Sequence, residues 1–321
     1  CKSDLLMTNE NPENIHGPTS SISDDRLKGN KFDYMITNPP FGVSWKNEKK
    51  FVDDESKDPN GRFSVGTPRT SDGSLLFLQH LIHKMNPEGS RIGIVLNGSP
   101  LFSGDAGSGE SEIRKLIIEN DWLECVVQLP DQMFFNTGIT TYFWIVTNKK
   151  SEERKGKVQL IDGSSFYKEM KKSLGSKRKE ISIEQSDQLF NIYKSFEEGE
   201  FSKIYSNNFF GYTKVVVEQP LKENSEVVTN KKGDPKPDSS KRDNERVPLS
   251  DDINEYFRKE VQPHLKDSWM DRTKDKVGYE INFRKYFYKF KELRKVQDIQ
   301  NDLDHFDQEI QIISKELNSI G

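Results

Sequence analysis

Cysteine is scarce in this sequence, and long apolar runs are absent. Only two cysteines, Cys1 and Cys125, occur among 321 residues. This content excludes a disulfide framework and is typical of a reducing compartment such as the cytoplasm. No window approaches the roughly 18 to 20 consecutive apolar residues of a membrane span, and the N-terminus lacks the layout of a signal peptide. We therefore expect a soluble, cytoplasmic protein with no membrane partner.

The chain also lacks an excess of basic charge and a recognisable metal site. Lysine and arginine total 48 against 52 aspartate and glutamate residues, and the net charge is -4. The whole chain therefore carries no signature of a free-standing nucleic-acid binder, and any such contact must come from local patches or from a partner. The five histidines show no spacing with cysteines or carboxylates that builds a metal centre. We expect no bound metal.

Strand and helix patterns alternate over the first 150 residues. The β-favouring run 31–37 ends at a double proline. After a cap at Ser71 or Asp72, apolar residues recur at helical spacing and predict a helix. RIGIVLNG (91–98) is the kind of apolar run expected for a strand buried on both faces. A Gly- and Ser-rich loop then caps a second helix, and further strands are predicted at 122–130, 140–150 and 157–166.

The strands 122–130 and 140–150 follow one another without a helix between them, so we expect them to be antiparallel neighbours. The remaining alternation of strands and helices indicates an α/β fold with a mostly parallel, doubly wound sheet. Only about half of such a sheet is visible in the sequence.

The tetrapeptide Asn38-Pro39-Pro40-Phe41 stands where the first strand ends. Prolines donate no amide hydrogen, so the Asn38 side chain and the Pro39 carbonyl form a rigid pair of acceptors. A planar amine such as adenine, flipped out of a duplex, suits such acceptors, with Phe41 stacking on the ring. In isolation the tetrapeptide is equally well a plain turn, but the carboxyl ends of α/β strands are where such folds bind ligands.

These residues resemble a known family. Asn-Pro-Pro-Phe matches the [N/D/S]-P-P-[Y/F] motif of amino-group methyltransferases, and residues 97–150, with GDAGSGESEIRK, resemble the modification (M) subunit of type I restriction-modification systems. SDGSLLFLQHLIHKM and FGYTKVVVEQPL are similar to that family too. The resemblance implies a Rossmann-like methyltransferase sheet, mostly parallel with one antiparallel strand, that transfers a methyl group from S-adenosylmethionine to adenine N6 in DNA.

The resemblance assigns site residues as well. Asn38 and Pro39 would accept the hydrogens of the amine, and Pro40 and Phe41 complete the catalytic corner. Phe41 would stack on the flipped adenine, and Phe135 or Phe134 would cover the base's other face. Of this pair we favour Phe135. Ordinary core packing is the alternative for both residues, and for Phe134 it is the better interpretation.

The methyl-donor site is expected outside this sequence. In the family a Gly-rich loop and an acidic residue hold the donor, and both would lie upstream of Cys1, so we expect the chain to be a fragment that binds S-adenosylmethionine poorly. NIHGPTSSISDD (14–25) resembles the loop that borders the donor's adenine, but Pro18 stands where a polar residue is usual. We therefore assign no residue to the cofactor. SGDAGSGE follows a later strand, and we interpret it as a helix cap.

The resemblance also divides the chain. We expect the C-terminal part of the catalytic domain over 1–166, an extension with a basic stretch over 167–221, a flexible insertion over 222–246 and a helical C-terminal region over 247–321. The basic run 168–179 would either grip DNA phosphates or form a solvated helix face. An a/d seam in the predicted helix 293–317 would pack in a core of its own or dock on a specificity (S) subunit.

The expected partners are therefore DNA, the S subunit and a second M subunit, with the restriction (R) subunit as a further candidate. Two rival functions stay open: a methyltransferase acting on a protein glutamine, which also uses an Asn-Pro-Pro-Tyr motif, and a truncated subunit that only scaffolds the complex.

Overall fold

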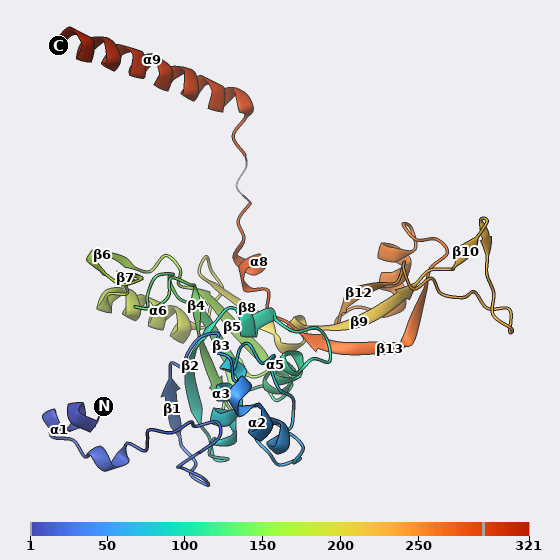
Figure 1. The fold of residues 1–321 in the computed structure, drawn as a ribbon, viewed down its shortest axis with the longest axis horizontal. Helices are drawn as coiled ribbons and strands as arrows, with labels where there is room; N and C mark the ends of the chain where they lie inside the picture. The colour runs from blue at the N-terminus through green and yellow to red at the C-terminus, as the bar shows by residue number, and fades with distance from the viewer. Residues whose placement is uncertain (1, 291–292, 321) are drawn as a thin grey trace. The chain divides into compact units, whose positions relative to one another are not determined.

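The computed structural model describes residues 2–290 and 293–320, and Cys1 lies outside the described residues. The chain divides into two compact units, Cys1–Phe283 and Arg284–Gly321 (Figure 1). None of the described helices combines the length and the apolar character that crossing a membrane requires.

A six-stranded sheet in the order β1-β2-β4-β3-β5-β8 forms the centre of the first unit (Figure 1). β1, β2, β3 and β5 run in one direction, whereas β4 and β8 run in the other. The predicted mostly parallel α/β fold is confirmed, as is the antiparallel pairing of β3 with β4. β8 is a second antiparallel strand that the sequence analysis missed. The strands are β1 (Tyr34–Thr37), β2 (Arg91–Asn97), β3 (Leu123–Gln128), β4 (Thr141–Thr147), β5 (Lys157–Asp162) and β8 (Ser202–Ser206).

Helices cover the two faces of this sheet unequally. α6 (Ile183–Ser195) packs Leu189, Ile192 and Tyr193 against alternate residues of β3, β4 and β5. On the other face α3 (Ser74–His83) contacts β2 and α5 (Gly109–Glu119). As predicted, the Gly- and Ser-rich loop caps α5, through the Ser108 side chain. Asp72 accepts hydrogen bonds from the Ser74 backbone and hydroxyl at the start of α3.

The prediction that β2 is buried on both faces is wrong for one of them. Ile92, Ile94 and Leu96 are fully buried, but the residues between them are only half-buried. The reason is that α6 covers β3, β4 and β5 but stops short of β1 and β2. A hollow of about 550 Å³ lies there, lined by residues of β1, β2, β4 and α6.

The basic run forms a β-hairpin and not a helix face. β6 (Lys168–Leu174) pairs antiparallel with β7 (Lys177–Glu180) through a turn at Gly175 (Figure 1). We refer to residues 168–180 as the basic hairpin. The solvated helix predicted as one alternative for this run is therefore wrong, because a positive-φ glycine reverses the chain in the middle of it.

A separate three-stranded antiparallel sheet, in the order β12-β9-β13, follows the central one. It corrects the expectation of a wholly helical region over 247–321, because β13 is an eleven-residue strand. The last residues of the predicted insertion 222–246 also belong to this sheet, because β12 begins at Asp243. The elements are β9 (Gly211–Glu218), β10 (Lys222–Glu223), β11 (Glu226–Val227), β12 (Asp243–Pro248), α7 (Ile253–Tyr256), η5 (Phe257–Val261) and β13 (Trp269–Tyr279).

Arg114 fixes the end of β13 to the helices that pack on the six-stranded sheet. This fully buried side chain of α5 donates hydrogen bonds to the carbonyls of Tyr279, Pro100 and Gly104. Burial lowers the pKa of Arg114 to about 10, so the guanidinium stays charged at neutral pH. Three carbonyl acceptors compensate the cost of burying this charge.

The second unit contains α9 (Val296–Ile320), which confirms the predicted C-terminal helix but begins three residues later than expected. Apart from Leu317, whose side chain lies outside the described residues, the predicted seam is exposed along α9. The remaining short elements of the chain are α1 (Lys2–Met7), η1 (Pro12–Asn14), η2 (Lys46–Glu48), α2 (Lys49–Glu55), α4 (Ser99–Phe102), η3 (Glu152–Arg154), η4 (Asn207–Phe210) and α8 (Phe283–Phe287).

Candidate functional site

The Asn-Pro-Pro-Phe corner stands at the carboxyl end of β1, as predicted. Pro39 is buried and fixes the corner to the domain, whereas Asn38 and Pro40 are exposed. A buried proline beside an exposed asparagine gives the asparagine a rigid base while its amide faces solvent. The corner can therefore present the Asn38 side-chain oxygen to a ligand.

The structure brings an aromatic of the β3–β4 loop to this corner. The ring of Phe134 packs edge-on against the ring of Phe41, with 5.4 Å between the centroids. Phe135, the residue favoured from the sequence, has 62% of its surface exposed. Phe134 is thus fixed by its neighbour, and Phe135 keeps its surface open to a ligand.

The chain after the corner is anchored to the turn before α3, which the sequence analysis did not foresee. Trp45 is buried and its indole donates a hydrogen bond to the Arg69 carbonyl at 2.9 Å. The backbone amides of Trp45 and Gly73 donate to the carbonyls of Thr70 and Val43. This short ladder holds the exit of the corner in place.

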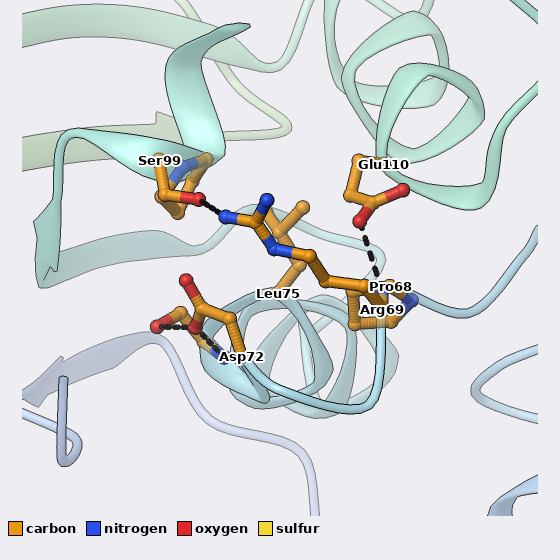
Figure 2. Close-up of a pocket in the computed structure, with 8 residues that line it drawn as sticks. Pro68, Arg69, Asp72, Leu75, Ser99 and Glu110 are labelled. Carbon is orange, nitrogen blue, oxygen red and sulfur yellow. Dashed lines mark hydrogen bonds between the residues drawn. The ribbon is translucent and has the colours of Figure 1, made fainter. Parts of the chain in front are cut away.

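The turn before α3 lies at a junction where the N-termini of α3, α4 and α5 meet, and hydrogen bonds hold it there. Figure 2 shows the Arg69 side chain reaching Ser99 at the start of α4, while the Arg69 amide donates to Glu110 of α5 at 2.8 Å. Asp72 lies beside them and bonds to the start of α3. The cavity among these side chains measures about 10 Å³, room for about one water molecule. The junction therefore supports the corner and is too small for a substrate.

Two buried oxygens near the corner have no hydrogen-bond partner in the described part of the chain. They are Oδ1 of Asn97, at the end of β2, and Oγ1 of Thr141, at the start of β4. The two residues face each other in the sheet, and Asn97 donates to Asp72 at 3.3 Å. Asn97 was not predicted as a site residue. The signal that could have identified it is its place as a polar residue at the carboxyl end of a buried strand, where α/β folds bind ligands.

The glycines of SGDAGSGE do not form a cofactor cradle. A Cβ on Gly109 would lie 1.9 Å from the Thr67 carbonyl oxygen, so the protein's own backbone fills the place that a phosphate would take. This agrees with the interpretation of the loop as a helix cap.

The loop 14–25 lines a hollow of about 440 Å³ beside β1. Its charged groups are paired with one another: Asp25 with Lys84 at 2.8 Å, and Asp24 with Arg26 at 2.7 Å. No buried polar atom lining it in the described chain lacks a partner. The described residues that line this hollow therefore leave no unpaired buried polar group for a methyl donor.

No group of three or more histidine, cysteine, aspartate or glutamate side chains that could hold a metal occurs in the described chain. His80 is instead a core residue whose Nδ1 lies 2.8 Å from the Arg62 guanidinium. Arg62 also pairs with Glu55. Burial, and then the positive charge of Arg62, lower the pKa of His80 to about 4. His80 is therefore neutral at pH 7 and accepts a hydrogen bond from Arg62.

This histidine predicts a loss of stability in acid. The pKa of His80 is about 4 in the fold against 6.5 ordinarily, so the unfolded chain binds the proton first. As pH falls from 6.5 to 4, the free energy of unfolding should drop by up to about 3 kcal/mol on this account. Urea unfolding at several pH values measures it. His80→Gln should flatten this part of the pH dependence, and the exposed His264→Gln should not. Equal slopes for both variants would contradict the assignment.

The chain matches known proteins over most of its length. The family model described as N-6 DNA Methylase matches residues 1–238. A type I restriction enzyme methylase subunit of Methanocaldococcus jannaschii is 30% identical over 65% of this chain and 36% of the relative. A second, of Haemophilus influenzae, is 37% identical over 41% of this chain and 27% of the relative. The chain thus spans about a third of the length of these curated relatives.

A solved structure agrees with these matches. The type I restriction-modification methyltransferase subunit of Streptococcus thermophilus is 25% identical, with a TM-score of 0.53 over 64% of this chain and 41% of that one. The predicted resemblance to type I modification subunits is confirmed. The family model covers well over half of the sequence, including the Asn38 corner and the loop that carries Phe134 and Phe135. The chain therefore belongs to the N-6 DNA methylase family.

Proposed function

We propose that the chain is the acceptor-presenting part of an adenine-specific DNA methyltransferase subunit of a type I restriction-modification system. The methyl donor would be S-adenosylmethionine and the product N6-methyladenine in DNA. The observation that carries the proposal is the corner itself: an exposed Asn38 and a buried Pro39 at the carboxyl end of a strand, with Phe41 beside them. It would act in the cytoplasm, the reducing compartment that the cysteine content predicts.

The corner can align an exocyclic amine. One amine hydrogen would be donated to the Asn38 side-chain oxygen and the other to the Pro39 carbonyl oxygen. These two bonds would localise the nitrogen lone pair and aim it at an electrophilic carbon. Because the amine loses its proton after attack, no strong general base is needed and alignment supplies much of the rate. Pro40, which has no amide hydrogen, would keep a competing donor away from these acceptors.

Two aromatic side chains would hold the base. Phe41 is half-buried and held edge-on by Phe134, so its remaining face can stack on adenine. Phe135, which is largely exposed, would cover the other face of the base. Stacking is worth about 1 to 3 kcal/mol per base, which helps to offset the cost of flipping it out of the duplex.

The donor-binding part would complete the sheet beside β1. Tyr34 and Ile36 are each 83% exposed, and within the described residues β1 pairs on one side only, with β2. An unpaired strand edge with bare apolar side chains favours pairing with a further strand. The hollows on either side of β1 would then be closed by that addition.

A binding measurement tests where the donor site lies. The 321-residue chain alone should bind S-adenosylmethionine with a dissociation constant above about 1 mM, because the charged groups that line the hollow beside β1 are already paired with one another. Isothermal titration calorimetry measures the affinity, with the whole subunit titrated in parallel as the control. Micromolar affinity for the chain alone would contradict the division proposed here.

The assembly proposed for the protein contains the S subunit, bound through α9, a second M subunit and DNA, with the R subunit as a further partner. Incubating the whole subunit and its S subunit with methyl donor separates the rival functions. N6-Methyladenine on adenine-containing DNA, and no product on adenine-free DNA, supports the proposal. Methylated protein instead supports the glutamine methyltransferase, and no methylated product supports the scaffold.

A further inference from the structure

The basic hairpin is a strongly charged local surface of the first unit. Residues 168–180 contain six basic and two acidic side chains, a net charge of +4 in a chain whose total is -4. Most of these basic side chains are exposed. Lys168 lies 3.6 Å from Glu184, but Lys171, Lys172 and Arg178 form no ion pair with any residue that the structure describes.

The hairpin is bound by its backbone to the loop that carries Phe135. The Ser176 amide donates to the Phe135 carbonyl at 2.9 Å, and the Arg178 amide donates to the Gln132 carbonyl at 2.9 Å. Lys179 also pairs with Asp131 at 2.5 Å. The same loop places Phe134 against Phe41 of the corner. A continuous set of contacts therefore links the hairpin to the place proposed for the flipped base.

Two residues at the hairpin turn meet Phe135 closely. Gly175 has a φ of +61°, and a Cβ there would lie 2.5 Å from the Phe135 carbonyl oxygen. A larger residue would thus strain the turn and push the loop away. The Lys177 ammonium stands over the Phe135 ring, 5.5 Å from its centroid, within the range of a cation–π contact.

The hairpin has little apolar surface of its own. Met170 and Leu174 are its only apolar side chains apart from the glycine, and Leu174 is 44% exposed. An isolated two-stranded hairpin is marginally stable in water, and close cations of like sign repel one another. A polyanion would relieve that repulsion, and DNA offers a regular row of phosphates.

We propose that the basic hairpin binds the DNA phosphate backbone beside the flipped base and, through its contacts with residues 131–135, positions Phe135 on that base. The inference rests on the proposed DNA methyltransferase function. Lys171, Lys172 and Arg178 bind phosphate, and Gly175 and Lys177 are positioning residues that act through Phe135. Binding of the DNA backbone and stacking of the base are thereby coupled in one element.

Salt dependence tests the phosphate contacts. In the whole subunit assembled with its S subunit, the triple variant K171A/K172A/R178A should weaken DNA binding by about 10-fold or more. It should also reduce the slope of log K against log salt by about 2 to 3, since each lost phosphate contact removes about 0.9. The matched control K231A/K232A/K236A removes three lysines from the segment between β11 and β12 and should leave the slope unchanged.

The positioning role needs a different readout. Lys177→Gln should lower kcat by about 10-fold while changing the DNA dissociation constant less than about 2-fold, and it should reduce the fluorescence change of 2-aminopurine placed at the target adenine. Lys177→Arg, which keeps a cation over the ring, should have the wild-type kcat and the wild-type fluorescence change. Gly175→Val should act like Lys177→Gln.

The outcomes separate this inference from the function on which it rests. No methyladenine from the wild-type complex defeats the proposed function itself. Methylation by the wild type, with wild-type affinity and salt slope in the triple variant, overturns the hairpin's role alone. So does loss of co-purification with the S subunit in that variant, which makes the hairpin a protein interface. Equal kcat and fluorescence for Lys177→Gln and the wild type overturn the positioning of Phe135.

Discussion

Replacing Asn38 by alanine is expected to lower kcat for DNA methylation by about 100- to 1,000-fold, the usual effect of removing one preorganised dipole from a developing charge. The amine nitrogen becomes positive as it attacks, and the Asn38 oxygen is one of the two acceptors proposed to stabilise it. Asn38 is exposed, so its removal leaves no cavity in the core. The free energy of unfolding should therefore change by less than about 0.5 kcal/mol.

The measurement is single-turnover methyl transfer to a duplex by the whole subunit with its S subunit. Asn38→Asp keeps an acceptor at the same place, and aspartate is permitted there by the motif, so it should retain more activity than Asn38→Ala. Asn191→Ala on α6, also exposed, is the matched control and should keep the wild-type rate. A kcat for Asn38→Ala within threefold of the wild type would exclude the corner from the chemistry.

The order of the central strands shows what sequence alone can give. Local apolar runs and the missing helix before residue 140 predicted each strand from β1 to β5 and the antiparallel pairing of β3 with β4. The insertion of β4 between β2 and β3 depends on pairings such as Asn97 with Thr141, 44 positions apart in the sequence. No local pattern encodes such a partner.

β13 was missed because its own composition argues against a strand. WMDRTKDKVGY is rich in charge, and only its last two residues are buried. It forms because β9 pairs with both of its ends, on either side of an irregularity between Asp271 and Lys276, and because Arg114 binds its last residue. Tertiary pairing here outweighs intrinsic β propensity.

The candidate site was predicted in part for a similar reason. The proline corner is a local feature and could be recognised from four residues. Its supports are not local: Trp45 bonds to Arg69, and Arg69 bonds to Glu110, 41 residues further along. The hairpin turn carried a usable signal, since Gly175-Ser176 interrupts the basic run, but charge alone was used to interpret it.

Charges placed in the seam of α9 are expected to prevent assembly with the S subunit. Leu303 and Ile310 occupy the same heptad position and are 53% and 60% exposed. Such apolar rows are stable in water only when a facing helix covers them. Leu303→Asp with Ile310→Asp would bury two uncompensated carboxylates at that contact. We expect dissociation of the complex at micromolar concentration, measured by size-exclusion chromatography with light scattering.

The control must change charge without touching the seam. Asn301→Asp with Gln308→Asp adds the same two charges on the opposite side of α9, where both residues are exposed, and should leave the assembly intact. Circular dichroism checks that both variants keep their helix, which separates a lost contact from a lost fold. If the seam variant co-elutes with the S subunit in wild-type proportion, another surface must hold the partner. Because Asn38 lies outside α9, either result for the seam variant leaves the proposed chemistry of the corner unaffected.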